Sequence, residues 1–304
     1  MSIAEEYRIK KELGSQKKRK FGRAFLVISI FNPQQKAILK TIGKTEHNTH
    51  LQDRLRNEKN YSFDFSQLPS VLGFEETENE IFLLLHFKEG VTLDEYWKTV
   101  RKNDRIKTLK TLLLSLNSTF ELLKSKKIVH CDIKPSNILV NDHNGKIETH
   151  LIDFGLALNT EDHTEREILF PLGYAAPELI LNRLECIDHT TDIFALGITI
   201  WRLFTGSLPL VHPNPSIYTN LQIVHPLPEH NAIPHELWKI LAKMCHKHAF
   251  KTAPNLMSAR EVSEVLKLNN TKRYEDLHSI MKDLSQLQDR NWLNTILFGI
   301  LKRN

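Results

Sequence analysis

His130-Cys131-Asp132-Ile133-Lys134-Pro135-Ser136-Asn137 is the stretch that decides the fold of this chain, together with Asp153-Phe154-Gly155 further along. Phosphoryl transfer from a metal-bound nucleotide needs a carboxylate that orients the acceptor hydroxyl, a cation near the travelling phosphate and oxygen ligands for magnesium. The two segments supply these groups at four positions: Asp132, Lys134, Asn137 and Asp153. The residue types and their order therefore predict a phosphotransferase.

A third motif, Ala176-Pro177-Glu178, follows the first two in the order that protein kinases use. On these motifs the chain resembles the eukaryotic-like Ser/Thr protein kinase family. The resemblance implies an α+β, two-lobed protein-kinase-like fold, with a small β-rich N-lobe that has one main helix and a larger, mainly helical C-lobe. It also implies ATP and Mg2+ or Mn2+ as cofactors, and a serine or threonine hydroxyl of a protein as the acceptor.

The resemblance assigns a role to each residue of the two segments. Asp132 would orient the acceptor hydroxyl, and Lys134, whose position two residues later is the Ser/Thr-kinase pattern, would neutralise the γ-phosphate. Asn137 would be catalytic as well, and it would hold the metal together with Asp153. These assignments predict a Ser/Thr protein kinase that transfers the γ-phosphate of Mg-ATP.

Lys40 and Glu58 are the candidates for a second part of the nucleotide site. Lys40 lies in an extended segment, residues 36–40, and Glu58 lies in a charged, helix-compatible segment, Asp53–Tyr61. In the family such a lysine holds the α- and β-phosphates of ATP, and such a glutamate fixes the lysine. Glu46 is a weaker rival to Glu58 for this role.

The predicted phosphate-covering loop departs from the family pattern. It keeps only the outer two glycines, Gly14 and Gly22, with the basic run Lys17–Lys20 between them. Close backbone approach to phosphate needs glycine or a special conformation, so either ATP is covered less tightly or the basic side chains replace the missing contacts. The favoured interpretation of Lys17–Lys20 is a solvated charge run without a role in binding. Residues 86–90 resemble the hinge of the family, in which backbone groups of His86 and Lys88 would bind adenine.

Hydrophobic periodicity and turn residues divide the chain into lobes. We expect a protein kinase domain over residues 1–268, followed by a C-terminal helical extension over residues 269–304. Within the domain we expect an N-lobe over about residues 1–85, a hinge over about 86–90 and a C-lobe over about 91–268.

Three elements are readable from pattern in the second half of this domain. Apolar residues at three- and four-residue steps predict a long helix that begins near Asp104. Residues 137–152, with a turn at Asn144-Gly145, predict a hairpin. Thr191–Phe204 predicts a strongly apolar helix, and Asp192 at its start is expected to brace the catalytic loop.

The residue at position 131 and the expected partner of Glu178 differ from regulated members of the family. Cys131 stands where many of them carry an arginine that pairs with a phosphate on the activation segment, and a thiol cannot form that ion pair. We therefore expect activity not to depend on phosphate at Thr160 or Thr164, and Cys131 to be a packing residue. Glu178 normally pairs with an arginine near the end of the domain, for which Arg260 is the nearest candidate.

These departures leave two alternatives open. A pseudokinase or nucleotide-binding scaffold is suggested by the altered glycine loop and by Pro171, which replaces a threonine of the family pattern. Every residue needed for the chemistry is nonetheless present. A small-molecule kinase of related fold is less favoured, because the Ala-Pro-Glu segment belongs to the protein-substrate branch.

Composition narrows the class of protein. Lys and Arg number 41 against 36 Asp and Glu, a net charge of +5 that is too mild and dispersed to imply a nucleic-acid substrate. Three scattered cysteines predict no disulfide framework and hence a reducing, cytoplasmic compartment, although a protein delivered into another cell would look the same. No secretory signal and no membrane-spanning run is recognisable.

The predicted C-terminal extension carries apolar residues at helical spacing. Five of them are Leu277, Ile280, Met281, Leu284 and Leu287. They predict a helix that packs onto the large lobe, or one that contacts a partner or a membrane surface.

Overall fold

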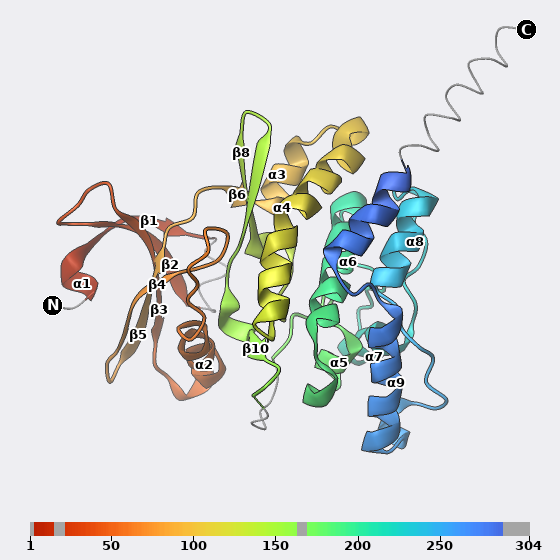
Figure 1. The fold of residues 1–304 in the computed structure, drawn as a ribbon. Coiled ribbons are helices and arrows are strands. Elements are labelled where there is room, and N and C mark those ends of the chain that lie inside the picture. Colours follow the sequence, from red (N-terminus) through yellow and green to blue (C-terminus); the bar gives the residue numbers. More distant parts are fainter. Residues whose placement is uncertain (1–2, 15–21, 163–168, 288–304) are drawn as a thin grey trace, which may run out of the picture. The chain divides into compact units, whose positions relative to one another are not determined.

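The chain divides into two compact units in a computed structural model that describes residues 3–14, 22–162 and 169–287. The first unit contains residues 1–92 and 137–157, and the second contains residues 93–136 and 158–304. Strands predominate in the first unit and helices in the second (Figure 1). This confirms the predicted α+β class with one β-rich and one mainly helical lobe, while the predicted domain and hinge boundaries stay predictions.

A five-stranded antiparallel sheet forms most of the first unit, in the order β1-β2-β3-β5-β4 (Figure 1). Its strands are β1 (Tyr7–Leu13), β2 (Arg23–Ser29), β3 (Lys36–Gly43), β4 (Val71–Glu76) and β5 (Glu80–His86). Side chains alternate between the two faces of a strand, so β3 and β5 contribute to an apolar cluster on each face of the sheet. On one face Phe25, Val27, Ala37, Leu39 and Leu84 pack together, and Ile3 of α1 (Ile3–Glu6) packs against them.

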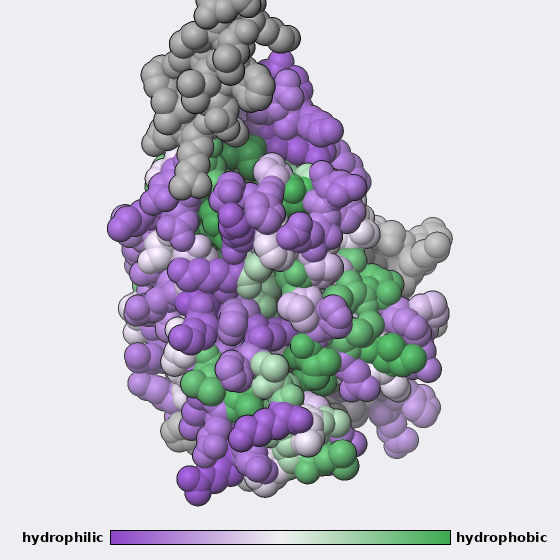
Figure 2. Space-filling model, turned by 90° about the vertical axis from the view of Figure 1, so that its right-hand side faces the viewer, coloured by the Kyte–Doolittle hydropathy of each residue, from purple (hydrophilic) through white to green (hydrophobic). Residues whose placement is uncertain are grey.

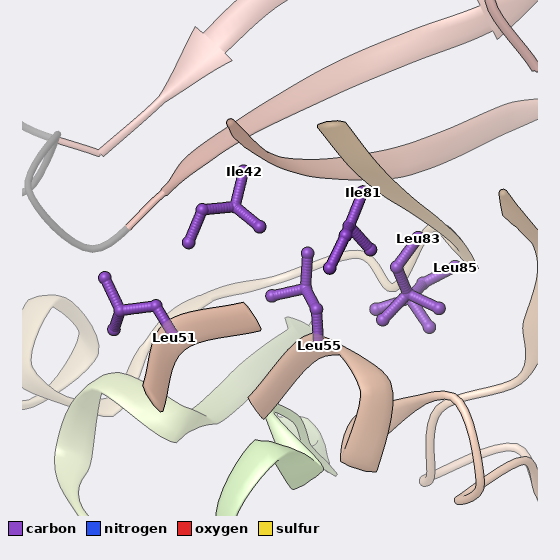
Figure 3. Close-up of a cluster of buried hydrophobic side chains, with 6 residues drawn as sticks. All are labelled: Ile42, Leu51, Leu55, Ile81, Leu83 and Leu85. Atoms are coloured by element: carbon purple, nitrogen blue, oxygen red, sulfur yellow. The ribbon is translucent and has the colours of Figure 1, made fainter. Parts of the chain in front are cut away.

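Helix α2 (Thr49–Glu58) packs against the opposite face of the sheet. Figure 3 shows its apolar side chains next to those of the strands in a cluster of Ile42, Leu51, Leu55, Ile81, Leu83 and Leu85. The sequence predicted a helix over Asp53–Tyr61, so the observed helix begins earlier and ends sooner. Burial of Leu51 in the cluster accounts for the earlier start, because tertiary packing stabilises a turn that local propensity leaves undecided.

The first unit also contains the predicted hairpin of β8 (Ile138–His143) and β9 (Lys146–Leu151). Asn144 and Gly145 connect the two strands and both have positive φ, as a two-residue hairpin turn requires. Strand β6 (Val91–Thr92) pairs with β8. The predicted hairpin is confirmed.

The second unit is mainly helical (Figure 1). Its described α-helices are α3 (Leu93–Thr99), α4 (Arg105–Ser125), α5 (Pro177–Ile180), α6 (His189–Thr205), α7 (Pro215–Val224), α8 (His235–Met244) and α9 (Ala259–Lys272). Two short strands, β7 (Ile128–Val129) and β10 (Leu158–Asn159), pair with each other. Six 3-10 turns are described in the two units: η2 (Glu46–Asn48), η3 (Lys102–Asp104), η4 (Pro135–Asn137), η5 (Phe154–Leu156), η6 (Leu184–Cys186) and η7 (Pro254–Leu256).

Helices α4 and α6 confirm the two helices that the sequence predicted. Helix α6 begins two residues before the predicted Thr191, because Asp188 caps it through the Thr190 amide and forms a capping box with Thr191. Every residue from Thr190 to Trp201 is buried. Such a helix belongs to the interior of the unit, where a continuous apolar sequence is stabilised on all sides.

The surface of the second unit is mixed. Figure 2 shows the face that carries α8 and α9, on which hydrophilic side chains predominate and apolar patches lie between them. Residues 277–287 are helical, and Leu277, Ile280 and Leu284 are buried, which confirms the packing predicted for this part of the extension. Within residues 3–14, 22–162 and 169–287, no helix is both long and apolar enough to cross a membrane.

A buried ion pair joins two distant segments of the second unit. Glu178 Oε1 and Oε2 accept hydrogen bonds from Arg273 at 2.5 and 3.1 Å, and both side chains are fully buried. The Thr191 hydroxyl donates a third bond to Glu178 at 2.8 Å. Arg260, the nearest candidate in the sequence, is the wrong residue, because it lies exposed on α9 and pairs with Glu264.

The buried pair predicts a large difference between two arginine variants. Arg273→Ala removes the cation from a buried carboxylate, so we expect the free energy of unfolding to fall by about 3–5 kcal/mol. Arg260→Ala removes only an exposed ion pair, for which a loss below about 1 kcal/mol is expected. Urea unfolding of both variants measures the difference, and equal losses would contradict the assignment of Arg273.

Candidate active site

Lys40 and Glu58 form the central contact of the first unit. The Lys40 ammonium lies 2.7 Å from both carboxylate oxygens of Glu58. Lys40 lies two residues from both Ile38 and Ile42, so the three side chains share one face of β3. Ile38 and Ile42 pack in the cluster with α2, and the Lys40 side chain therefore points toward that helix. The rival Glu46 lies exposed in the η2 turn. The structure therefore brings together the predicted pair.

Asp153 joins this pair as a second carboxylate. Its Oδ1 lies 3.3 Å from Lys40 Nζ, and its Oδ2 lies 3.5 Å from an Arg54 guanidinium nitrogen. The Asp153 backbone is left-handed, with φ of 68°, immediately before the short turn η5 (Phe154–Leu156). A non-glycine residue in this region is strained by about 1 kcal/mol or more, so surrounding contacts must hold it.

Asn137 lies at the same end of the hairpin as Asp153. The Asn137 carbonyl oxygen accepts the Ile152 amide at 2.9 Å, next to the Ile138–Leu151 pair of the ladder. The side chain of Asn137 is buried. Carboxylate and amide oxygens are the ligands that magnesium prefers, so this donor set fits a divalent metal that also binds a nucleotide.

Burial and charge act against each other at the Lys40–Glu58 pair. Burial lowers the pKa of Lys40, but the carboxylates of Asp153 and Glu58 outweigh it, so the pKa is raised from its ordinary value. Burial raises the pKa of Glu58 and the Asp153 carboxylate adds to that effect, while Lys40 lowers it. Lys40 is therefore a fixed positive charge at neutral pH, as an anion-binding residue must be.

The two glycines of the predicted phosphate loop flank residues 15–21, which lie outside the described residues together with the basic run Lys17–Lys20. Gly14 and Gly22 have φ of 85° and 90°. A Cβ on Gly22 would lie 3.1 Å from the Thr41 carbonyl oxygen. Glycine at this position thus permits both the left-handed backbone and the close approach to β3.

The predicted hinge residues lie at and beyond the end of β5. His86 is the last residue of that strand, and the Lys88 ammonium donates to the Ser66 carbonyl at 2.8 Å. Burial lowers the pKa of Lys88. The Lys88 side chain is thus bound to a carbonyl group of the protein. The predicted recognition of adenine uses backbone groups of His86 and Lys88, and it stays a prediction.

The other two predicted catalytic residues lie in the second unit. The Lys134 ammonium lies 2.7 Å from both oxygens of Asp132, whose side chain is fully buried. The two residues are held by a loop whose backbone is anchored from α6. Asp192 accepts the His130 amide at 2.7 Å and the Cys131 amide at 2.9 Å, as the sequence predicted for a bracing residue.

Cys131 is the most constrained residue of this loop. Its backbone has φ of 62°, its side chain is buried, and its thiol donates toward the Val129 carbonyl at 3.6 Å. Burial raises the pKa of the neighbouring Asp192 to about 7, while the two amide donors lower it. The Asp192 hydrogen bonds hold the backbone of a left-handed residue directly before Asp132.

Sequence reasoning missed the polar residues of α2 that face the Asp153 segment. Arg54 contacts Asp153, and Asn57 and Tyr61 donate to backbone carbonyls beyond it. The Phe154 ring packs 5.8 Å from the Tyr61 ring and 5.2 Å from that of Phe63. Arg54 and Asn57 are three residues apart and lie on one face of α2, a signal that the sequence contained, whereas Tyr61 lies just beyond the end of the helix.

A protein-family model matches most of the chain. The family model described as protein kinase domain matches residues 7–282. The chain belongs to the protein kinase domain family. The match includes every predicted catalytic, metal-binding and nucleotide-binding residue of the two units.

Several kinases resemble the chain in sequence. A Synechocystis protein named Serine/threonine-protein kinase D is 29% identical over 228 residues, which cover 69% of this chain and 43% of that protein. The Aurora kinase of Saccharomyces cerevisiae is 27% identical over 211 residues, 67% of this chain and 54% of that protein. Serine/threonine-protein kinase SBK1 of Danio rerio is 29% identical over 224 residues, with coverages of 71% and 55%. The chain spans about half the length of these relatives.

The role of Asp192 can be tested through stability. Asp192→Asn keeps the size of the side chain but sets an amide group against one backbone N–H, so a buried donor loses its acceptor. At pH 8, where the wild-type carboxyl is ionised, we expect the free energy of unfolding to fall by about 1–3 kcal/mol. The exposed Asp64→Asn variant is the control, expected within about 0.5 kcal/mol of wild type. If urea unfolding shows no difference between the variants, Asp192 does not brace the loop.

Proposed function

We propose that the chain is a Ser/Thr protein kinase that transfers the γ-phosphate of Mg-ATP to hydroxyl groups of proteins. One observation carries the proposal: Lys40, Glu58 and Asp153 meet within hydrogen-bonding distance although 113 residues separate the first from the last. Membership of the protein kinase domain family supports it. The names of two similar proteins, from Synechocystis and Danio rerio, also specify serine and threonine.

Within the first unit, each residue has a distinct task in this proposal. Lys40 binds phosphate oxygens through a positive charge that Glu58 holds in place. Asp153 and Asn137 supply oxygen ligands for Mg2+ or Mn2+. The bound metal neutralises phosphate charge and orients the γ-phosphate for displacement. Gly14 and Gly22 let the backbone at either end of the phosphate loop adopt conformations that other residues resist.

The catalytic loop of the second unit handles the acceptor. Asp132 orients the hydroxyl and accepts its proton, and its burial keeps competing water away. Lys134 places a cation beside Asp132, where it stabilises the negative charge of the phosphate that is being transferred. The carboxylate and the ammonium are already held together, so little reorganisation is needed.

The proposal also covers the class of acceptor, the cellular compartment and the dependence of activity on phosphorylation. The acceptor is a protein rather than a nucleic acid, and a reducing, cytoplasmic compartment suits three cysteines that form no disulfide, all of which lie in the described residues. Cys131 offers no charge for a phosphate on Thr160 or Thr164, so activity should not depend on it; Thr164 lies outside the described residues. A contact with a partner or membrane surface through the extension, residues 269–304, stays a prediction, and residues 288–304 of this extension also lie outside the described residues.

The function is tested with radiolabelled ATP, a broad panel of protein acceptors and the purified chain. We expect magnesium-dependent label on serine or threonine, and a loss of at least about 1,000-fold in Asp132→Ala and in Asp153→Ala. Asp142→Ala, which changes an exposed acid near the end of β8, is the control and should retain the wild-type rate.

The outcomes separate the proposal from its rival. If the wild type binds nucleotide but labels neither itself nor any acceptor, the chain is a nucleotide-binding scaffold. Label that appears only on a small molecule would instead support a small-molecule kinase. Activity that survives in both aspartate variants would contradict the assigned chemistry.

A further inference from the structure

A row of polar side chains on α2 and just beyond it faces the segment that follows Asp153. Arg54, Asn57 and Tyr61 succeed one another at three- and four-residue steps and all contact residues 153–157. Arg54 and Asn57 lie on one side of α2, and Tyr61 follows three residues beyond the end of the helix. The apolar side of the same helix, with Leu51 and Leu55, packs beneath the sheet (Figure 3). Helix α2 thus contacts the sheet and the Asp153 segment with different faces.

Asn57 makes two bonds to the backbone of this segment. Its amide nitrogen donates to the Gly155 carbonyl at 3.2 Å and to the Ala157 carbonyl at 2.9 Å. A side-chain amide has two N–H groups, so each carbonyl receives one of them. Two bonds from one side chain fix both the position and the direction of the short η5 turn between the carbonyls.

Tyr61 adds a third bond and an apolar contact. Its hydroxyl donates to the Ala157 carbonyl at 3.0 Å, and its ring packs against that of Phe154. Ala157 is fully buried, so its carbonyl gains little from solvent and relies on protein donors. Because a carbonyl oxygen has two lone pairs, Asn57 and Tyr61 can both bond to it.

Arg54 and Gly155 show how closely the helix approaches the segment. A Cβ on Gly155 would lie 3.2 Å from the Arg54 Cβ and 3.3 Å from the Arg54 carbonyl oxygen. The backbones can approach this closely only because residue 155 has no side chain. The contact brings the Arg54 guanidinium to the Asp153 carboxylate.

We propose that Asn57 and Tyr61 are positioning residues, which hold the Asp153 segment against α2 and thereby aim Asp153 at the metal. The inference rests on the proposed function, in which Asp153 is a metal ligand. Neither side chain touches the reacting groups. Their hydrogen bonds stabilise the left-handed Asp153 backbone, and α2 carries Glu58, so the same helix sets both Lys40 and Asp153.

This arrangement holds the Asp153 segment without the arginine that is absent at position 131. A phosphate on the activation segment has no arginine to recruit at position 131. The three hydrogen bonds to the Gly155 and Ala157 carbonyls need no modification to form. The segment is therefore positioned by the folded first unit itself.

The test compares nucleotide affinity with and without metal. The dissociation constant of the non-hydrolysable analogue AMP-PNP is measured by calorimetry in Mg2+ and in EDTA, for wild type, Asn57→Ala, Tyr61→Phe and the double variant. We expect the gain in affinity due to Mg2+ to fall about fivefold in each single variant, with affinity in EDTA nearly unchanged. Asn60→Ala, an exposed asparagine just past α2, is the matched control and should behave as wild type.

The double variant distinguishes positioning from general stability. Each single variant leaves one donor on the Ala157 carbonyl, whereas the double variant removes both, so its loss should exceed the product of the single losses. Faster amide hydrogen exchange in residues 153–158 should accompany it. A Mg2+ gain that is unchanged in Tyr61→Phe and Asn57→Ala would overturn the proposal, as would an equal loss in Mg2+ and EDTA.

The failure of catalysis would be a separate result. A wild type that gains affinity with Mg2+ but transfers no phosphate would refute the kinase activity alone, and the variants would still decide the positioning role. A wild type without any Mg2+ gain would overturn both. Tyr61→Phe retains the ring and its packing, so it remains informative if Asn57→Ala does not fold.

Discussion

The ion pair of Lys40 and Glu58 links strand β3 and helix α2 of the first unit. Glu58 is only 1% exposed, and removing a carboxylate from water costs several kcal/mol unless a cation accompanies it. The pair therefore excludes registers of α2 in which the two side chains do not meet. Leu51 and Leu55 then fill the space beneath β3 and β5 on the same helix (Figure 3).

The carboxylate of Asp153 also contacts Lys40, and the charges around it are balanced. Asp153 and Glu58 face Lys40 and Arg54, so two anions are opposed by two cations. The polar contacts of α2 with residues 153–157 make Asp153 part of the same rigid arrangement. In the second unit, Asp192 has an equivalent task, because it holds the backbone beside Asp132 by two amide hydrogen bonds.

Much of this was predictable from the sequence, because the motifs and periodicities act locally. The hairpin and the long helices followed from residue types and their spacing, whereas the two-unit α+β fold and the Lys40–Glu58 pair followed from the resemblance to protein kinases. The partner of Glu178 did not, since Arg273 is 95 residues away and no local pattern marks it. Arg54 and Asn57 were overlooked because polar residues on a charged helix usually face solvent, and only the folded segment after Asp153 gives them partners. The predicted start of α2 was too late because the burial of Leu51, which stabilises the first turn, depends on tertiary packing.

The central claim is that Glu58 holds Lys40 in the position that binds nucleotide phosphate. Calorimetric titration of Glu58→Gln with AMP-PNP in Mg2+ tests it most directly, beside Lys40→Met and the exposed control Glu46→Gln. The account predicts that Glu58→Gln and Lys40→Met each weaken binding by about tenfold or more, while Glu46→Gln stays within about twofold of wild type. A folded Glu58→Gln variant that binds as tightly as wild type would contradict it.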